Sequence, residues 1–312
     1  MKFTILISTY NRLYLLKRAI YSALNQTIDC EIVVVDDCSS DNTDIFVKSL
    51  GDSIVYHRNP VNQGHAASVN TGMAKANGEW VKFLDDDDYL APNCLEEMEK
   101  AISIHPHAVI CSCIAAQVDS KEVELSRTRP SGNGLACYIP QADLHYGMLL
   151  ELVPFGTPAQ VACRRDAFMK TEGWDSTLNT NCDDIDSWIH IAQFGDAIFL
   201  NQCLAYRTIW NGAYNQKISL SQRLATNILM KKKIYTLVDA QHRSKIPDFQ
   251  DIQKYLKLHW ILVAIKQRKF RSLLPILDLS ILSFQAWRIL LSVRFIRRFK
   301  LRNSPVRRIP LI

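Results

Sequence analysis

Two hydrophobic periodicities alternate along the first 118 residues. Short apolar runs typical of buried strands occupy 3–7, 31–35, 53–57, 79–84 and 108–118. Between them apolar residues recur at helical spacing, as at Leu13, Leu16, Ile20 and Leu24, and again within 39–50, 66–76 and 92–102. Repeated strand–helix–strand units predict an α/β fold with a mixed, mainly parallel sheet and helices on both faces.

The pattern changes twice further along the chain. Residues 119–145 are polar and contain Pro130, Gly132 and Gly134, so we expect a long functional loop there. A helix is predicted over 184–194 and a strand over 197–209, and from about residue 217 the pattern is helical with basic interruptions. We therefore expect an α/β domain over 1–212 and a helical region over 213–312.

Composition and charge narrow the class of protein. Hydrophobic residues make up 48% of the 312 residues and charged residues 22%, as in globular proteins. The net charge is +6, but eight basic residues and no acid lie beyond residue 285, so the rest of the chain is slightly acidic. A body without a basic stripe argues against a nucleic-acid partner.

The cysteines and the apolar runs bear on location. The nine cysteines form no Cys-x-x-Cys pair and no zinc-spaced cluster, which favours reduced thiols in a cytoplasmic protein over a disulfide framework. The sequence shows neither a signal peptide nor an uninterrupted apolar run of about 18 residues. We expect a cytoplasmic protein, at the inner face of the cell membrane if the basic tail contacts lipid.

Three acidic clusters are the candidate chemistry. Asp36-Asp37 and Asp85–Asp88 each follow a buried strand, and Asp183-Asp184 opens a helix. Taken singly, they are also typical of an Asx turn, a solvated acidic turn and favourable charges at a helix N-terminus. Together they indicate a site, because carboxylates at strand ends can bind a ribose or a hard divalent cation.

The segments around these clusters resemble the family 2 glycosyltransferases of GT-A fold over about the first 210 residues. The resemblance rests on Ile7-Ser8-Thr9-Tyr10-Asn11-Arg12, Val33-Val34-Val35-Asp36-Asp37-Cys38-Ser39, Asn62-Gln63-Gly64, Asn70-Thr71-Gly72 and Gly78–Asp88. It implies a metal-dependent enzyme that transfers a sugar from a nucleotide-sugar, by default a UDP-sugar, with inversion at the anomeric carbon.

Roles for individual residues follow from the same resemblance. Thr9, Tyr10 and Asp37 would hold the nucleobase, with Arg12 and Asp86 in the same nucleotide site. Asp85 and Asp87 match the family's Asp-x-Asp motif, so Asp87 would ligate Mn²⁺ or Mg²⁺ and Asp85 would contact the ribose or the metal. Asp184 would be the catalytic base, Asp183 its neighbour, and Arg207 a residue near the diphosphate.

The chain departs from the family pattern at four positions. Cys38 stands where glycine is common, Asp183 replaces glutamate, His190 replaces a frequent arginine, and Ile209 falls where some members have a metal-binding histidine. A third protein ligand at position 209 is therefore not expected.

Several single residues keep two interpretations. Trp188 and Trp210 are as typical of an acceptor sugar platform as of core packing. His57 and His65 are more typical of hydrogen-bonded structural histidines than of substrate contacts.

The basic tail predicts contact with an anionic membrane. Phe284, Trp287, Leu291 and Phe295 fall on one helical face, with Arg288 near its edge. The alternatives are a packed helix with a solvated basic face, or a disordered tail beyond Asn303. Membrane contact would suit a lipid-linked acceptor.

The function expected is therefore extension of a glycan or lipid-linked acceptor in surface polysaccharide synthesis. A sugar-nucleotide nucleotidyltransferase is a weaker interpretation, because no glycine-rich basic loop follows the first strand. A non-catalytic sugar-binding homologue is the third, and the intact acidic clusters argue against it.

Overall fold

The computed structural model describes residues 1–178, 182–210, 218–268, 275, 277–298 and 304–311. The strands are β1 (Phe3–Thr9), β2 (Cys30–Asp36), β3 (Val55–Arg58), β4 (Trp80–Asp85), β5 (Tyr89–Leu90), β6 (Ala108–Val118), β7 (Glu124–Arg127), β8 (Ala136–Ile139), β9 (Val161–Arg164), β10 (Asp196–Thr208) and β11 (Ile309–Pro310). The helices are α1 (Leu13–Leu24), α2 (Thr43–Ser49), α3 (His65–Lys75), α4 (Cys94–Ile104), α5 (Gln141–Leu149), α6 (Arg165–Phe168), α7 (Asp183–Ile191), α8 (Leu220–Leu237), α9 (Phe249–Lys266) and α10 (Phe284–Arg298).

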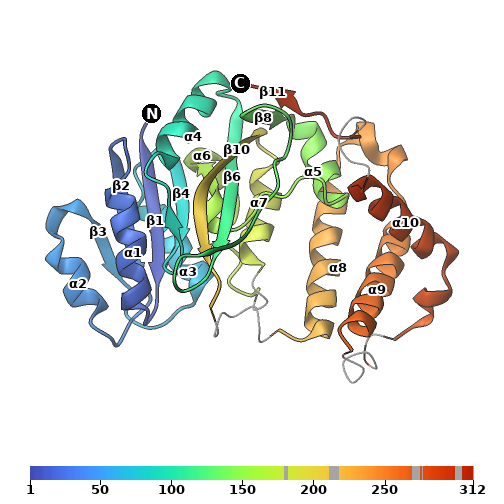
Figure 1. Cartoon of the computed structure of the whole chain (residues 1–312), viewed down its shortest axis with the longest axis horizontal. Coiled ribbons are helices and arrows are strands. Elements are labelled where there is room, and N and C mark those ends of the chain that lie inside the picture. Colours follow the sequence, from blue (N-terminus) through green and yellow to red (C-terminus); the bar gives the residue numbers. More distant parts are fainter. Residues whose placement is uncertain (179–181, 211–217, 269–274, 276, 299–303, 312) are drawn as a thin grey trace.

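All described strands belong to one mixed sheet with the order β11-β8-β10-β6-β9-β4-β1-β2-β3, and β5 and β7 pair off this path (Figure 1). Strands β4, β1, β2 and β3 are parallel, as repeated strand–helix–strand units require. Strand β9 is inserted between β4 and β6 and runs antiparallel to both. The predicted α/β fold with a mixed sheet is confirmed.

Two apolar clusters cover the two faces of the sheet. Alternate residues of β1 show the division, since Ile5 and Ile7 pack with α1 and α4, whereas Leu6 packs on the opposite face. The cluster that contains Leu6 continues through α3 and α7 into α8 and α9. Helices predicted from the first hundred residues therefore lie on both faces, as expected.

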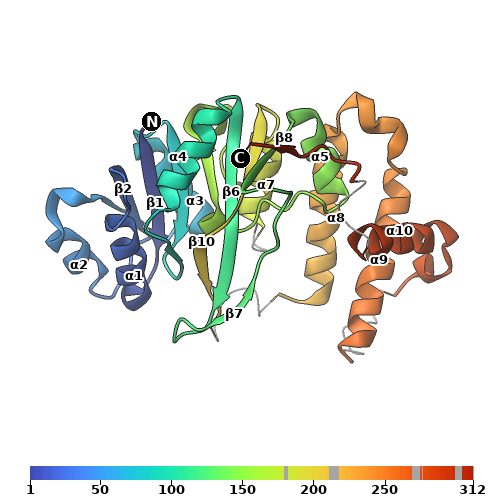
Figure 2. The same ribbon diagram turned by 45° about the horizontal axis from the view of Figure 1, so that its top comes forward.

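The C-terminal region packs against the sheet domain. Helix α8 contacts α5 and α7, α10 packs on α9, and β11 brings the chain back to pair with β8 (Figures 1 and 2). Arg307 closes this connection through hydrogen bonds to the buried Asp143. Residues 304–311 thus form an ordered return to the sheet, and the alternative of a disordered tail is wrong for them.

The expected long loop over residues 119–145 is wrong, because β7 and β8 lie within this segment and both pair in the sheet. The predicted boundary at 212/213 lies outside the described residues, and the division into 1–212 and 213–312 stays a prediction.

Among the helices of the described residues, none is both long and apolar enough to cross a membrane.

Candidate active site

The register of the parallel strands brings the first two acidic clusters to one edge of the sheet. Ser8 pairs with Asp85 across β1 and β4, and Thr9 pairs with Asp36 across β1 and β2. The carboxyl ends of these strands therefore meet, which is where α/β proteins bind ligands. Residues far apart in sequence become neighbours because of this pairing.

The Asp36-Asp37 pair organises the loops at this edge. Both carboxylates are buried. Asp37 Oδ1 accepts hydrogen bonds from the Asn59 amide at 2.8 Å and the Gln63 N–H at 2.9 Å, and its Oδ2 accepts from the Gly64 N–H at 2.8 Å. Asp37 thus fixes the loop that leads into α3, and its contact with a nucleobase stays a prediction.

Cys38 follows with φ of 65°. This left-handed conformation favours glycine, which accounts for the glycine common in the family at this position.

The Asp85–Asp88 turn is tied to β1, α1 and β10. Asp86 is buried and accepts hydrogen bonds from Thr9 Oγ1 and Arg12 Nη1, both at 2.8 Å. Burial raises the pKa of Asp86 to about 6, against the lowering effect of Arg12. Thr9 and Arg12, predicted for the nucleotide site, therefore lie beside Asp86, and both hold this turn in place.

The other carboxylates of the turn form a compact oxygen cluster. One oxygen from each of Asp85, Asp87 and Asp88 lies within 4.8 Å of the others. Burial, followed by the charges of Asp87 and Asp85, holds the pKa of Asp88 well above its usual range. A hard divalent cation fits this donor set, since carboxylate oxygens are its preferred ligands and its charge would offset their repulsion.

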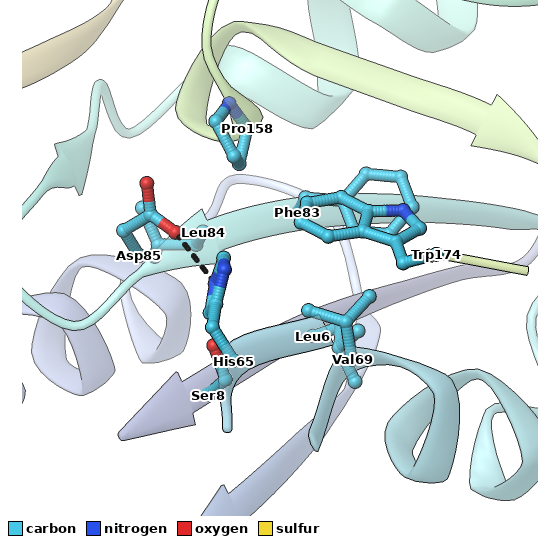
Figure 3. A pocket seen from close by; sticks show the side chains of 9 residues that line it. All are labelled: Leu6, Ser8, His65, Val69, Phe83, Leu84, Asp85, Pro158 and Trp174. Atoms are coloured by element: carbon cyan, nitrogen blue, oxygen red, sulfur yellow. Dashed lines mark ion pairs between the residues drawn. The ribbon is translucent and has the colours of Figure 1, made fainter. Parts of the chain in front are cut away.

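His65 joins the second and third acidic clusters. Its Nε2 lies 3.4 Å from Asp85 Oδ1 (Figure 3). Its Nδ1 lies 3.2 Å from Asp183 Oδ2. Burial lowers the pKa of His65, but hydrogen bonds to Asp183 and Asp85 outweigh it and raise the pKa well above the usual value. Sequence reasoning gave His65 little weight, because proximity to residues 85 and 183 cannot be read from one segment.

Asp184 follows on the first turn of α7. Burial, and then the charge of Asp183, raises the pKa of Asp184 to about 7. A carboxylate with a pKa near the working pH is suited to accept a proton. Helix α7 is held against α8 by an ion pair, because Lys233 Nζ of α8 lies 2.6 Å from Oδ1 of the buried Asp186.

The indole of Trp174 lines a pocket together with His65 and Asp85 (Figure 3). Trp174 packs edge-on against His65 at 5.3 Å and against Trp188 at 5.9 Å between ring centroids. Trp188 is 1% exposed and also packs on Phe83, which makes it a core residue. The interpretation of Trp188 as a sugar platform is therefore wrong.

The remaining candidates lie around the Asp85–Asp88 turn. Tyr10 is 45% exposed at the end of β1. Arg207 is on β10, and its positive charge opposes the rise in the pKa of Asp88 that burial causes. Trp210 donates its indole N–H to Asp87 Oδ2 at 2.9 Å, a contact that no sequence pattern indicated.

Solved structures share this architecture. Staphylococcus aureus TarS 1–349 in complex with UDP-GlcNAc has a TM-score of 0.63 and 16% identity over 99% of both chains. A mannosyltransferase from Pyrobaculum calidifontis in complex with GDP-Man and Mn²⁺ has a TM-score of 0.54 and 16% identity, over 96% of this chain and 87% of its own. These likenesses define the class of fold, that of the GT-A glycosyltransferases.

The sequence identifies the family within this class. Residues 4–171 match the model of glycosyl transferase family 2, which is more than half of the chain. The chain belongs to this family and is a glycosyltransferase.

One relative of the chain is the GalNAc(5)-diNAcBac-PP-undecaprenol beta-1,3-glucosyltransferase of Campylobacter jejuni. It is 41% identical over 140 residues, which cover 43% of this chain and 43% of the relative. The similarity thus spans less than half of the relative's length.

Proposed function

We propose that this glycosyltransferase moves a sugar from a UDP-sugar, with inversion, to a hydroxyl group of a glycan or lipid-linked acceptor in surface polysaccharide synthesis. The observation that carries the proposal is the convergence of Asp85, Asp183 and Asp184 around His65. The UDP-GlcNAc complex of TarS and the undecaprenol-linked acceptor in the name of the Campylobacter relative support the choice of donor and acceptor.

The chemistry assigns separate tasks to the acidic clusters. A sugar hydroxyl is a poor nucleophile at neutral pH, so it requires a base within hydrogen-bond reach. Asp184 takes this proton as the hydroxyl oxygen attacks the anomeric carbon and the nucleoside diphosphate leaves from the opposite side. One base and one displacement give inversion.

Asp85, Asp87 and Asp88 would hold Mn²⁺ or Mg²⁺. The bound cation supplies positive charge against the diphosphate as it leaves. Thr9 and Arg12 keep Asp86 paired, so that this fourth carboxylate of the turn adds less repulsion to the site.

Donor binding and transfer are tested separately. We expect UDP-sugars to raise the melting temperature only with Mn²⁺ or Mg²⁺, and Asp87→Ala to remove that dependence. The control is Asp52→Asn, an exposed acid on the short helical turn before β3. Equal metal-dependent shifts in both variants would contradict the metal assignment.

Asp184→Asn tests the base. We expect it to lose transfer, with UDP binding retained and Glu172→Gln, an exposed acid nearby in sequence, as the control. Retained turnover in Asp184→Asn would remove Asp184 as the base. A stereochemical assay by NMR of the product tests inversion.

We also propose that α10 contacts an anionic membrane, which suits a lipid-linked acceptor. On α10, Phe284 and Leu291 are 77% and 60% exposed, and Trp287 lies between them along the helix at 37%. Leu282, on the short helical turn before α10, is 80% exposed. Arg288 is exposed on the same helix and provides positive charge beside this apolar surface.

The membrane proposal needs point variants, because deletion of the tail would also remove β11 and the Arg307–Asp143 contact. We expect Phe284→Asp with Leu291→Asp to reduce sedimentation with vesicles that contain anionic lipid. Ile45→Asp, which changes a 65% exposed residue of α2, is the matched control. Equal sedimentation of all three proteins would refute membrane contact by α10.

A further inference from the structure

The indole ring of Trp210 is attached to the acidic turn. Its Nε1 donates to Asp87 Oδ2 at 2.9 Å. The Arg12 guanidinium lies 5.5 Å from the centre of the Trp210 ring, and Arg12 Nη1 lies 3.7 Å from the same Asp87 oxygen. Oδ2 of Asp87 therefore has a hydrogen-bond donor, the indole N–H, and a cation, the Arg12 guanidinium, close to it.

The backbone of Asp87 is held independently. Arg18 Nη2 donates to the Asp87 carbonyl oxygen at 2.7 Å and also to Thr208 Oγ1. The Arg18 guanidinium lies 4.5 Å from the centre of the Tyr89 ring, and Tyr89 stacks on Tyr206 at 4.6 Å. This frame fixes where Asp87 leaves the main chain, whereas Trp210 fixes how its carboxylate is turned.

We propose that Trp210 is a positioning residue for the cation site: its N–H holds Asp87 Oδ2 and leaves Oδ1 for the metal. The inference rests on the proposed metal-dependent function. Without the indole, the side chain of Asp87 can rotate away from Asp85 and Asp88, because three adjacent carboxylates repel one another. Hydrogen bonds that orient metal ligands are commonly worth 10- to 100-fold in metal affinity.

Two substitutions separate this role from stacking on an acceptor sugar. Trp210→Phe keeps an aromatic ring but has no N–H donor, whereas Trp210→Leu has neither. If Trp210 positions Asp87, both variants lose metal affinity. If it is only a sugar platform, Trp210→Phe keeps both metal affinity and the acceptor KM, and only Trp210→Leu raises the KM.

The test is direct titration of the protein with Mn²⁺ in the presence of UDP, with free Mn²⁺ measured by electron paramagnetic resonance. We expect Trp210→Phe to bind Mn²⁺ about tenfold more weakly or worse, with an unchanged melting temperature without metal. Trp260→Phe, the same exchange on α9, is the control and should bind as the wild type does. Equal affinity of the wild type and Trp210→Phe would overturn the inference and leave the proposed function intact. Absence of binding of both Mn²⁺ and Mg²⁺ by the wild type would overturn the inference together with the metal dependence of the proposed function.

Discussion

Replacing Asp184 by asparagine should raise the stability of the fold while it removes transfer. The structure holds this carboxylate at a pKa of about 7, against an ordinary value of 3.8. At about 1.4 kcal/mol per pKa unit, ionisation of Asp184 destabilises the folded state by up to about 4 kcal/mol. Because the side chain keeps some contact with solvent, we expect a gain of about 2 to 4 kcal/mol for Asp184→Asn.

The sign depends on pH. A carboxyl group with a raised pKa binds its proton more tightly in the folded chain, so its contribution to stability falls as the pH rises from about 4 to about 7. Above pH 7 the penalty is complete. The advantage of Asp184→Asn over the wild type should therefore grow between pH 5 and pH 8.

Urea unfolding at both pH values measures this difference, with EDTA present so that bound metal does not contribute. Glu172→Gln, the same kind of exchange at an exposed acid, is the control. Wild-type transfer should rise with pH through about 7, because the base must be ionised. Equal stability of Asp184→Asn and the wild type at pH 8 would refute the electrostatic reasoning.

Three further substitutions test the frame around the site by urea unfolding. Gly78→Ala should cost about 1 to 3 kcal/mol, since its Cβ would lie 2.5 Å from the Thr4 backbone nitrogen; an unchanged midpoint would show that the strands can separate there. Lys82→Met should lower the free energy of unfolding by about 1 to 3 kcal/mol or more, because the buried ammonium donates hydrogen bonds to the carbonyl oxygens of the turn that leads into β9. An unchanged free energy of unfolding would contradict this and would mean that water takes the place of the ammonium. Asp143→Ala should cost about 3 kcal/mol, since it leaves the buried His242 without its carboxylate partner and releases Arg307, and should speed proteolysis of the tail; a protected tail would contradict the role of Arg307.

Local sequence patterns predicted much of the fold. The strands before Asp36 and Asp85, and the helix that begins at Asp183, were found because buried parallel strands are continuous apolar runs and helices repeat every 3.6 residues. The segment 119–145 differs from its prediction because β7 and β8 are only four residues each, and β8 pairs with the distant β10.

The sequence indicates the acidic residues of the candidate site but not the contacts that connect them. His65 had no local signal, since its two partners are supplied by β4 and α7. Trp210 had two equal interpretations until β10 placed it against Asp87. The deciding contacts, His65 with Asp183 and Trp210 with Asp87, join residues more than a hundred positions apart along the chain.

Spacing and residue type are enough to predict the alternation of strands and helices, the three aspartate clusters and the resemblance to a family. Which carboxylates face one another, which are paired, and why the pKa of Asp184 is held near 7 become visible once the chain is folded. Desolvation and Coulomb interactions depend on distances in space, and strand register sets those distances.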